Sequence, residues 1–199
     1  SGTVLTTAEA GAIERDSNCF YLTTDDGNRG VAVTEHFIRA DSTRTFSTGT
    51  SQQAIFNSPT NGRLTLETGC YLFECLISMD TMSATSGNGK FSLSNGGSAT
   101  LGSILYQVHG MDAALDTITA ISGVAETTAT VAAANSVTAT GTATVCTLFV
   151  KGTFEVTGAG TIIPSWANTT SNASVLKVGS YFKCNRIGST SVVSVGQWD

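Results

Sequence analysis

Residues 70–79 read CYLFECLISM, a run that is apolar at most positions. Alternate side chains of an extended strand point to opposite faces, so this run has two faces to compare. One face carries only apolar side chains, those of Tyr71, Phe73, Cys75 and Ile77. The other face is mostly apolar and carries Leu72, Glu74, Leu76 and Ser78. Such a strand is typical of the centre of a sheet that packs against a second sheet.

Segments with the same alternation recur on both sides of this run. They are residues 34–40, 63–66, 90–94, 148–156, 161–166 and 174–187. Turns rich in Gly and Asn separate them, and Gly179 interrupts the last one. Pro164 confines its segment to an edge or a bulge. Roughly eight strands, spaced by ~10–20 residues and without a convincing amphipathic helix, predict an all-β fold, an antiparallel jelly-roll β-sandwich.

Three segments between residues 100 and 147 have weaker patterns. Residues 100–110 are apolar enough for a strand, although a helical turn fits them too. Residues 111–121 are the most helix-like part of the chain, yet they are short and lack a firm cap. Residues 127–147 consist almost wholly of Thr, Ala, Val, Ser and Gly, a low-complexity composition that is typical of disorder. We favour strands there, because valines punctuate the polar and small residues.

The chain divides by composition into three parts. Residues 1–33 hold short β segments with less apolar content than a core requires, and they predict a neck or connector. Residues 34–189 predict the jelly-roll head, and residues 190–199 a C-terminal extension. The opening SGTVLTTAEAG lacks the charged start and apolar middle of a signal peptide. It is compatible with an internal segment of a longer protein.

The charge balance bears on the partners of the chain. Charged residues make up 13% of the 199 residues, roughly half the share in an ordinary soluble domain. The net charge is −5 and the ten basic residues are scattered from Arg15 to Arg186, which argues against nucleic acid as a partner. No apolar run reaches the ~20 residues of a membrane span, so we expect no membrane insertion. A neutral surface rich in Thr, Ser and Ala suits a protein that is buried in an assembly.

The five cysteines, an odd number without CxxC spacing, predict neither a zinc site nor a disulfide framework. They are Cys19, Cys70, Cys75, Cys146 and Cys184. Four of the five sit among Phe, Tyr, Leu and Val, where a free cysteine serves as a small core residue. We therefore expect reduced structural thiols in a protein made in a cytoplasm.

Catalytic chemistry has little support in the residue pattern. His36 and His109 lack a second His or Cys at metal spacing, so we expect both to be structural or surface residues. Ser103, His109 and Asp112 are close in sequence, but a triad depends on geometry in space, and no GxSxG elbow occurs. Acidic residues are too sparse in the middle of the chain to indicate a glycosidase carboxylate pair. The sequence predicts no enzyme, no cofactor and no metal.

Three further patterns have a plain structural interpretation beside a functional one. Residues 25–28 (DDGN) resemble a calcium loop but lack its alternating acidic ligands, so a polar turn is favoured. The glycosylation sequons at Asn168 and Asn172 are interpreted as a Thr- and Asn-rich loop in a chain made in bacteria. Trp166 and Trp198 fall near loops, where aromatic rings can stack on sugars, but the core is favoured for Trp166 beside two isoleucines. Neither tryptophan is predicted to bind a receptor.

The N-terminal part of the chain matches a known pattern. Residues 5–30 (LTTAEAGAIERDSNCFYLTTDDGNRG) resemble a junction common in bacteriophage tail-fibre and minor structural proteins. In that junction an AGA-I/L-E motif precedes a short aromatic strand, an acidic or glycine turn and an Arg-Gly pair. The matching residues here are Ala10 to Glu14, Cys19 to Leu22, Asp25 to Gly27 and Arg29-Gly30.

The rest of the chain resembles the C-terminal domain that often follows this junction in phage and prophage proteins. Its marks, in order, are NGRLTLETGCYLFECLISMDTMSATSGN (61–88), KGTFEVTGAGTIIPS (151–165) and GSYFKCNRIG (179–188). The resemblance implies a jelly-roll head, similar to tumour-necrosis-factor-like heads, that assembles as a homotrimer at a fibre end or on the virion surface. The tail SVVSVGQWD (191–199) extends past the usual end, and this stretch has no collagen-like Gly-X-Y stalk.

These observations lead to one functional hypothesis and two alternatives. The leading hypothesis is the receptor-binding head of a phage tail fibre, made in the bacterial cytoplasm and carried on the virion. Its expected partners are other copies of the chain, other virion proteins and host surface glycan or protein. The runner-up is a capsid decoration or head-fibre protein with a structural role only, and the third is a polysaccharide-degrading enzyme. No motif defines receptor-contact residues.

The low charge of the chain also favours its assembly as a homotrimer. Burying neutral surface between three copies removes it from water, and closed rotational symmetry prevents open-ended association. We expect the apolar strands 70–79 and 148–156 to fill the core of each protomer. Residues 127–147 are the candidate for the inter-subunit face, because their small side chains let backbones approach.

Overall fold

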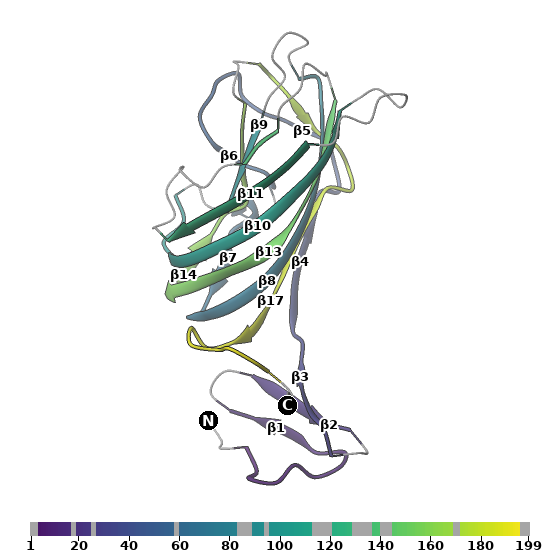
Figure 1. Ribbon diagram of the computed structural model, residues 1–199. Helices are drawn as coiled ribbons and strands as arrows, with labels where there is room; N and C mark the ends of the chain where they lie inside the picture. Colours follow the sequence, from purple (N-terminus) through teal and green to yellow (C-terminus); the bar gives the residue numbers. More distant parts are fainter. Residues whose placement is uncertain are drawn as a thin grey trace.

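The computed structural model is built almost entirely of β-strands (Figure 1). It describes residues 4–16, 19–24, 27–57, 60–82, 89–93, 96–112, 121–128, 137–139, 145–168 and 172–195. Within these ranges the one helical element is a 3-10 turn, η1, at Thr60–Gly62, and no helix is both long and apolar enough to span a membrane. Every strand pairing that the structure describes is antiparallel. The predicted all-β antiparallel fold is confirmed.

The larger sheet is built around β8 (Gly69–Asp80), the strand that the sequence placed at its centre. Its other strands are β4 (Glu35–Arg39), β5 (Arg44–Thr45), β10 (Thr100–Asp112), β11 (Ile121–Thr128), β13 (Cys146–Gly158), β16 (Val175–Leu176) and β17 (Tyr181–Gly188). β13 pairs with one edge of β8, and β16 and β17 pair with the other. Every second residue from Tyr71 to Met79 is buried, as the alternation predicted.

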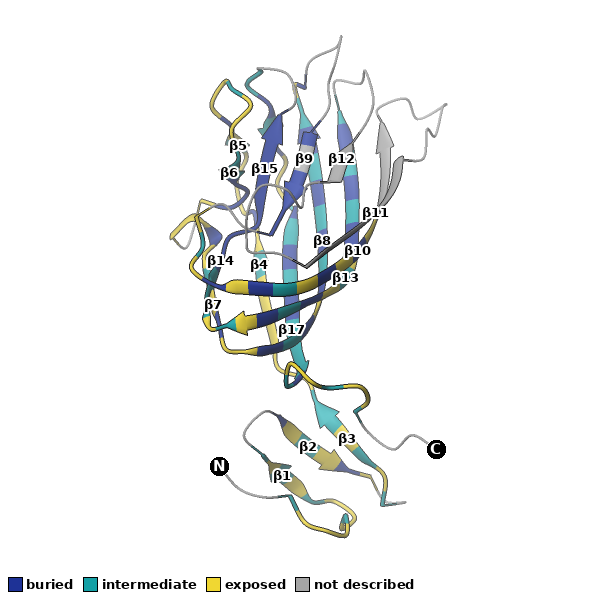
Figure 2. Cartoon of the chain, turned by 60° about the vertical axis from the view of Figure 1, so that its left-hand side comes forward, coloured by how far each residue is buried: buried dark blue, intermediate teal, exposed yellow. Residues whose placement is uncertain are grey.

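The second sheet faces the first across the core (Figure 2). Its strands are β6 (Gln53–Ala54), β9 (Gly89–Ser92), β12 (Val137–Ala139) and β15 (Ser165–Asn168), in the order β12-β9-β15-β6. A short antiparallel pair is formed by β7 (Leu64–Leu66) and β14 (Gly160–Ile162). In the sequence, β7 follows β6 of the second sheet and β14 precedes β15 of the same sheet. Pro164, which has no N–H to donate, stands at the break between β14 and β15.

The strand order is that of a jelly roll. Without the hairpin β10–β11 and the two-residue strands β5 and β16, the larger sheet reads β4-β17-β8-β13 and the second reads β6-β15-β9-β12. Among these eight strands, the chain crosses from one sheet to the other at each step except the one from β9 to β12. Two antiparallel sheets connected in this way form the double-sheet jelly roll, and the hairpin extends the larger sheet beyond β13. This order confirms the predicted jelly-roll β-sandwich.

Aromatic rings fill the space between the two sheets. Phe73, at the centre of β8, has rings from three other strands around it, with centroid separations of 6.0 Å to Tyr106, 5.7 Å to Phe154 and 6.0 Å to Phe182. Phe91 of β9 meets Tyr106 of β10 edge to face at 6.1 Å, which joins one sheet to the other. All five rings are at most 3% exposed, so the expected core strands do fill the core.

The three weakly patterned segments are extended where the structure describes them. Residues 100–112 form β10, so the helical turn considered for 100–110 does not occur. Met111 and Asp112 pair with β13, and Ile121 begins β11, so the helix-like interpretation is wrong for these residues. Residues 113–120 lie outside the described part. Residues 127–147 are the candidate for the inter-subunit face. Those that belong to β11, β12 and β13 are in strands, Val145 is described without a strand, and the others lie outside the described part of the chain.

Residues 13–32 form a separate three-stranded sheet, which we call the neck sheet. Its strands are β1 (Ile13–Arg15), β2 (Phe20–Thr23) and β3 (Arg29–Ala32). Only Val33 and Thr34 separate β3 from β4, so the chain passes directly from the neck sheet into the head. After β17 the chain returns to the neck sheet (Figure 1), where Ser194 and Val195 line a cavity together with Val4.

Ser92 on β9 and Ser165 on β15 are cross-strand neighbours, and we expect their replacement by alanine to have opposite effects on stability. Ser92 is 1% exposed and its hydroxyl has no hydrogen-bond partner among the described residues, whereas its cross-strand neighbour Ser165 donates to the carbonyl of Ile163 at 2.8 Å. Removing an unsatisfied buried hydroxyl is favourable, and removing a satisfied one leaves an acceptor unpaired. We expect Ser92→Ala to raise, and Ser165→Ala to lower, the free energy of unfolding in urea by about 1 kcal/mol each. A loss of stability in Ser92→Ala would contradict this account.

Candidate functional site

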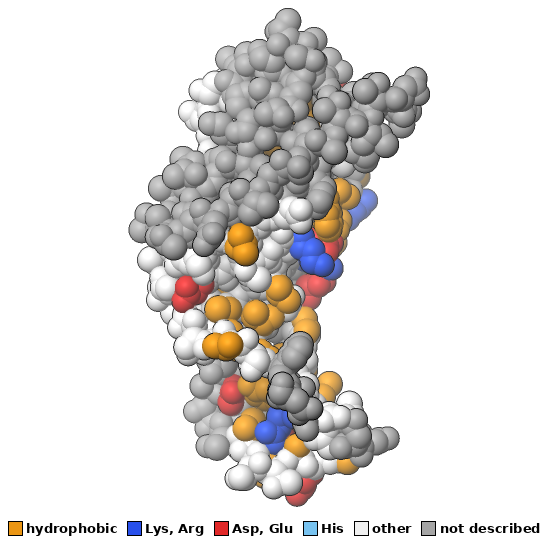
Figure 3. Space-filling view, viewed as in Figure 1, with side chains coloured by type: hydrophobic (Ala, Val, Ile, Leu, Met, Phe, Trp, Pro, Cys, Tyr) orange, Lys and Arg blue, Asp and Glu red, His pale blue; other side chains and the backbone are white. Residues whose placement is uncertain are grey.

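By register, the outer face of the larger sheet carries three rows of side chains that run across β17, β8 and β13. Figure 3 shows hydrophobic side chains on this side of the molecule, together with basic and acidic ones. The first row is apolar and consists of Tyr181, Leu76 and Phe149. The second is charged and consists of Lys183, Glu74 and Lys151. The third is mixed and consists of Asn185, Leu72 and Thr153, with Leu105 of β10 beyond it. We call these residues the outer face.

The charged row is neutralised largely within the chain. Lys183 Nζ lies 3.8 Å from Glu74 Oε1 and 3.5 Å from Glu35 Oε2 on β4. The Tyr181 hydroxyl donates a hydrogen bond to the Glu74 carboxylate, and this bond is the main reason why the pKa of Tyr181 rises to about 12. Glu74 therefore accepts a hydrogen bond from Tyr181 and pairs with the charge of Lys183, and no side chain in the row is arranged as an acid or base for catalysis.

The apolar members of the outer face remain accessible. Leu72 is 42% exposed and Leu105 is 49% exposed. Phe37 of β4 is 58% exposed and stacks on Tyr181 with a centroid separation of 5.7 Å. Apolar side chains beside paired charges suit contact with another protein surface rather than a chemical reaction.

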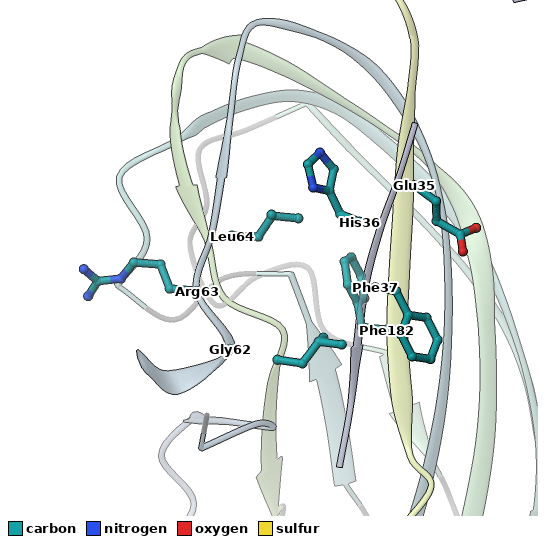
Figure 4. A pocket seen from close by; sticks show the side chains of 8 residues that line it. Glu35, His36, Phe37, Gly62, Arg63, Leu64 and Phe182 are labelled. Atoms are coloured by element: carbon teal, nitrogen blue, oxygen red, sulfur yellow. The ribbon is translucent and has the colours of Figure 1, made fainter. Parts of the chain in front are cut away.

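A cavity of about 310 Å³ opens at the edge of the sandwich, between β4 and the segment that contains η1 and β7 (Figure 4). Ile38, Leu64 and Phe182 give it an apolar lining. Glu35 and Arg63 stand at its rim, and Figure 4 shows them directed to opposite sides. Ligand sites combine apolar walls with a few convergent polar groups. The charged groups diverge here and the imidazole of His36 is the remaining polar side chain of the lining, so the cavity fits an apolar group beside one imidazole.

The structure separates the residues of the imagined triad. Ser103, His109 and Asp112 all lie on the single strand β10. A strand advances about 3.3 Å per residue, so Ser103 and His109 are separated by roughly 20 Å along it. His36 lies on β4 beside the cavity, apart from β10. In the described part of the chain no three His, Cys, Asp or Glu side chains are grouped to hold a metal ion.

Trp166 is a core residue, as the sequence favoured. It is fully buried, and its Nε1 donates a hydrogen bond to Asn168 Oδ1 at 2.9 Å. The Ser174 hydroxyl donates to the same oxygen at 2.9 Å, and Asn168 Nδ2 donates to the carbonyl of Asn172 at 2.7 Å. Asn168 is thus the centre of a buried polar network at the end of β15, not a residue of the Thr- and Asn-rich loop that the sequence suggested. Trp198 lies outside the described residues.

The remaining predicted features are structural in character. All five cysteines are free, and all except Cys70 are buried. Burial raises the pKa of the Cys184 thiol to about 12, which keeps it protonated and unreactive. At the DDGN turn, Gly27 has φ 80° and its N–H donates to the carbonyl of Thr24 at 3.0 Å, which closes a tight turn between β2 and β3. Asp25 and Asp26 lie outside the described residues.

Comparison with known proteins adds no family assignment. No protein-family model matches the sequence, and no curated protein matches it. Among solved structures, the TNF protein Eiger from S. frugiperda aligns at 10% identity over 81% of this chain and 97% of its own, with a TM-score of 0.35. The infectious bursal disease virus Gt strain aligns at 12% identity over 94% of this chain and 50% of its own, with a TM-score of 0.18. These TM-scores are too low to carry an argument, so the jelly-roll assignment rests on the strand order.

Proposed function

We propose that this chain is a trimeric head module of a bacteriophage attachment protein, carried on the virion. The observation that carries the proposal is the placement of the neck sheet. The chain enters the jelly roll from β3, and residues 189–195 return to the same end (Figure 1). The opposite end of the sandwich is therefore free of both described ends of the chain. A module held at one end and free at the other suits attachment to a surface.

The free end is where we place the contact with host glycan or protein. By register, Met79 of β8, Cys146 of β13 and Asp112 of β10 lie side by side there. Lys177 and Asp80 form an ion pair of 2.6 Å beside them, and both side chains remain partly exposed. Turns at the end of a rigid sandwich can vary in sequence without disturbing the core, which makes them suitable for recognition.

Three copies would strengthen such an attachment. A surface with few charges favours burial between subunits, and three linked sites gain effective concentration over a single one. The outer face, with exposed Leu72 and Leu105 beside paired charges, adds surface of the kind that protein contacts use. A capsid decoration protein could use the same surface. The position of the chain on the phage particle therefore distinguishes host attachment from capsid decoration.

Antibody labelling of intact particles tests the proposal. Antibodies raised against the purified chain and applied to the phage that encodes it are expected to mark fibre ends in electron micrographs. The purified chain should also compete with that phage for adsorption to its host. Labelling of the capsid shell without competition would favour the decoration function instead. We also expect no release of reducing sugar from host polysaccharide, and such release would point to the enzyme.

A further inference from the structure

The neck sheet exposes its apolar side. By register, Ile13 stands opposite Leu22, and Leu22 stands opposite Gly30, so the three share one face. Phe20 lies on this face as well, because it is two residues from Leu22 on β2. Ile13 is 76% exposed, Leu22 47% and Phe20 45%, and Figure 2 shows the exposed stretches along β1 and β2. We call Ile13, Phe20, Leu22 and Gly30 the neck face.

The other side of the neck sheet is polar and covered. Glu14 and Arg29 form an ion pair of 2.8 Å with side chains only 7% and 22% exposed. The N–H of Leu5 donates to Glu14, and Arg29 donates to the carbonyl of Leu5 at 2.8 Å, so the N-terminal segment lies over this pair. A small sheet is normally stabilised by covering its apolar side. Here the polar side is covered within the chain and the apolar side is left open.

Nothing in the described part of the chain requires a glycine at position 30. Its φ does not lie in the left-handed region, and a Cβ built on it would meet no described atom within 4 Å. By contrast, Gly62 has φ 64° and close contact with Phe56, so that glycine is required. Gly30 lies at the end of the row formed by Ile13, Leu22 and Gly30, on the edge strand β3, where a missing side chain leaves room for another surface to approach closely.

We propose that the neck face packs against the neck faces of the other copies in the homotrimer, so that the three neck sheets form the base of the assembly. A sheet of three short strands has no core of its own, so another surface must cover its apolar side whenever the chain is folded. A second copy of the same chain is always present to provide that surface. Symmetry brings identical residues together, and the centre of the neck face is uncharged. Arg15 shares this side of the sheet, because it stands opposite Phe20 on the edge strand β1, and its guanidinium lies 5.3 Å from the Phe20 ring centroid. This inference rests on the trimer of the proposed function and names its contact.

The double variant Ile13→Glu/Leu22→Glu tests the neck face, with the molar mass followed by light scattering from about 1 to about 100 µM protein. Both positions are exposed in the protomer, so the head should keep its β-sheet circular dichroism and its thermal transition. We expect the mass to fall from three chains to one. Gly30→Glu is a second variant that the protomer tolerates for the same reason, and it should have the same effect.

Val178→Glu is the matched control, because Val178 is 49% exposed against 47% for Leu22 but lies in the turn between β16 and β17 of the head, outside both the neck face and the outer face. It should keep the mass of three chains. Neck variants that stay trimeric would overturn the proposal, and so would loss of the trimer in the control, because added charge alone would then explain the result. A wild-type monomer would overturn the trimer of the proposed function as well. A trimeric wild type with unaffected neck variants would overturn the neck contact alone.

Discussion

Gly89→Ala is expected to destabilise the protein by about 3 kcal/mol, the upper range for inserting a methyl group into a packed core. A Cβ at this position would lie 1.7 Å from Cζ2 of Trp166. The indole ring has little freedom to move, because it is fully buried and its Nε1 is held by Asn168 at 2.9 Å. The added methyl group must therefore displace either the strand β9 or the tryptophan. We expect the variant to unfold at clearly lower urea concentration than the wild type.

A double-mutant cycle tests the cause of this loss. Trp166→Phe shortens the ring that meets the new methyl group, at the cost of a cavity and of the hydrogen bond to Asn168. If the overlap is the cause, adding Trp166→Phe to Gly89→Ala should cost less than Trp166→Phe costs by itself. Fully additive losses, or a Gly89→Ala variant with wild-type stability, would show that the ring does not occupy this space.

Phe73→Ala is the second substitution with a large expected effect, a loss of about 3–5 kcal/mol in the free energy of unfolding. Phe73 is 3% exposed and stands among the rings of Tyr106, Phe154 and Phe182, which come from three other strands. Its removal leaves a cavity where the strands of the larger sheet meet the core. Urea unfolding followed by tryptophan fluorescence measures the loss.

The neighbouring residue supplies the control for Phe73. Leu72 lies on the same strand but points to the outer face and is 42% exposed. Leu72→Ala should cost less than about 1 kcal/mol, because an exposed side chain leaves no cavity. Equal losses at the two positions would contradict the assignment of inner and outer faces on β8.

Much of the fold could be predicted from local patterns. The alternation in residues 70–79 identified the buried side of β8, because the two faces of a strand differ whenever one is covered. Gly179 marked the break between β16 and β17, whereas Pro164, which was expected at an edge or a bulge of one strand, lies between the two separate strands β14 and β15. The helix-like pattern of residues 111–121 misled at its described start, because Met111 pairs with Thr147 of β13, and this long-range pairing overrides a local helical tendency.

The glycine positions show what local patterns leave out. Gly152 stands opposite Phe73 on one side and Tyr106 on the other, and a Cβ there would lie 2.1 Å from the carbonyl oxygen of Leu105. Its role depends on residues about 50 and 80 positions away in the sequence. The sequence alone identifies it only as a glycine within a strand, which is compatible with a bulge or with close approach of another group.

The outer face and the neck face could not be predicted from local patterns either, because both depend on the register between strands. The rows of the outer face arise because β17, β8 and β13 align Lys183, Glu74 and Lys151. The neck face arises because Ile13 meets Leu22 across two short strands. Periodicity predicts which residues of one strand share a side, but it does not say which strand lies next to it or at what offset. Absence of a catalytic motif could be read from the sequence, whereas these surfaces could not.

Sedimentation equilibrium of the wild-type chain tests the trimeric attachment module most directly, because both the linked receptor sites and the neck contact require three copies. The chain mass is 20.5 kDa, and the account predicts a species of three times that mass that persists when the protein is diluted from about 100 to about 1 µM. A mass of one chain at every concentration in that range would contradict it.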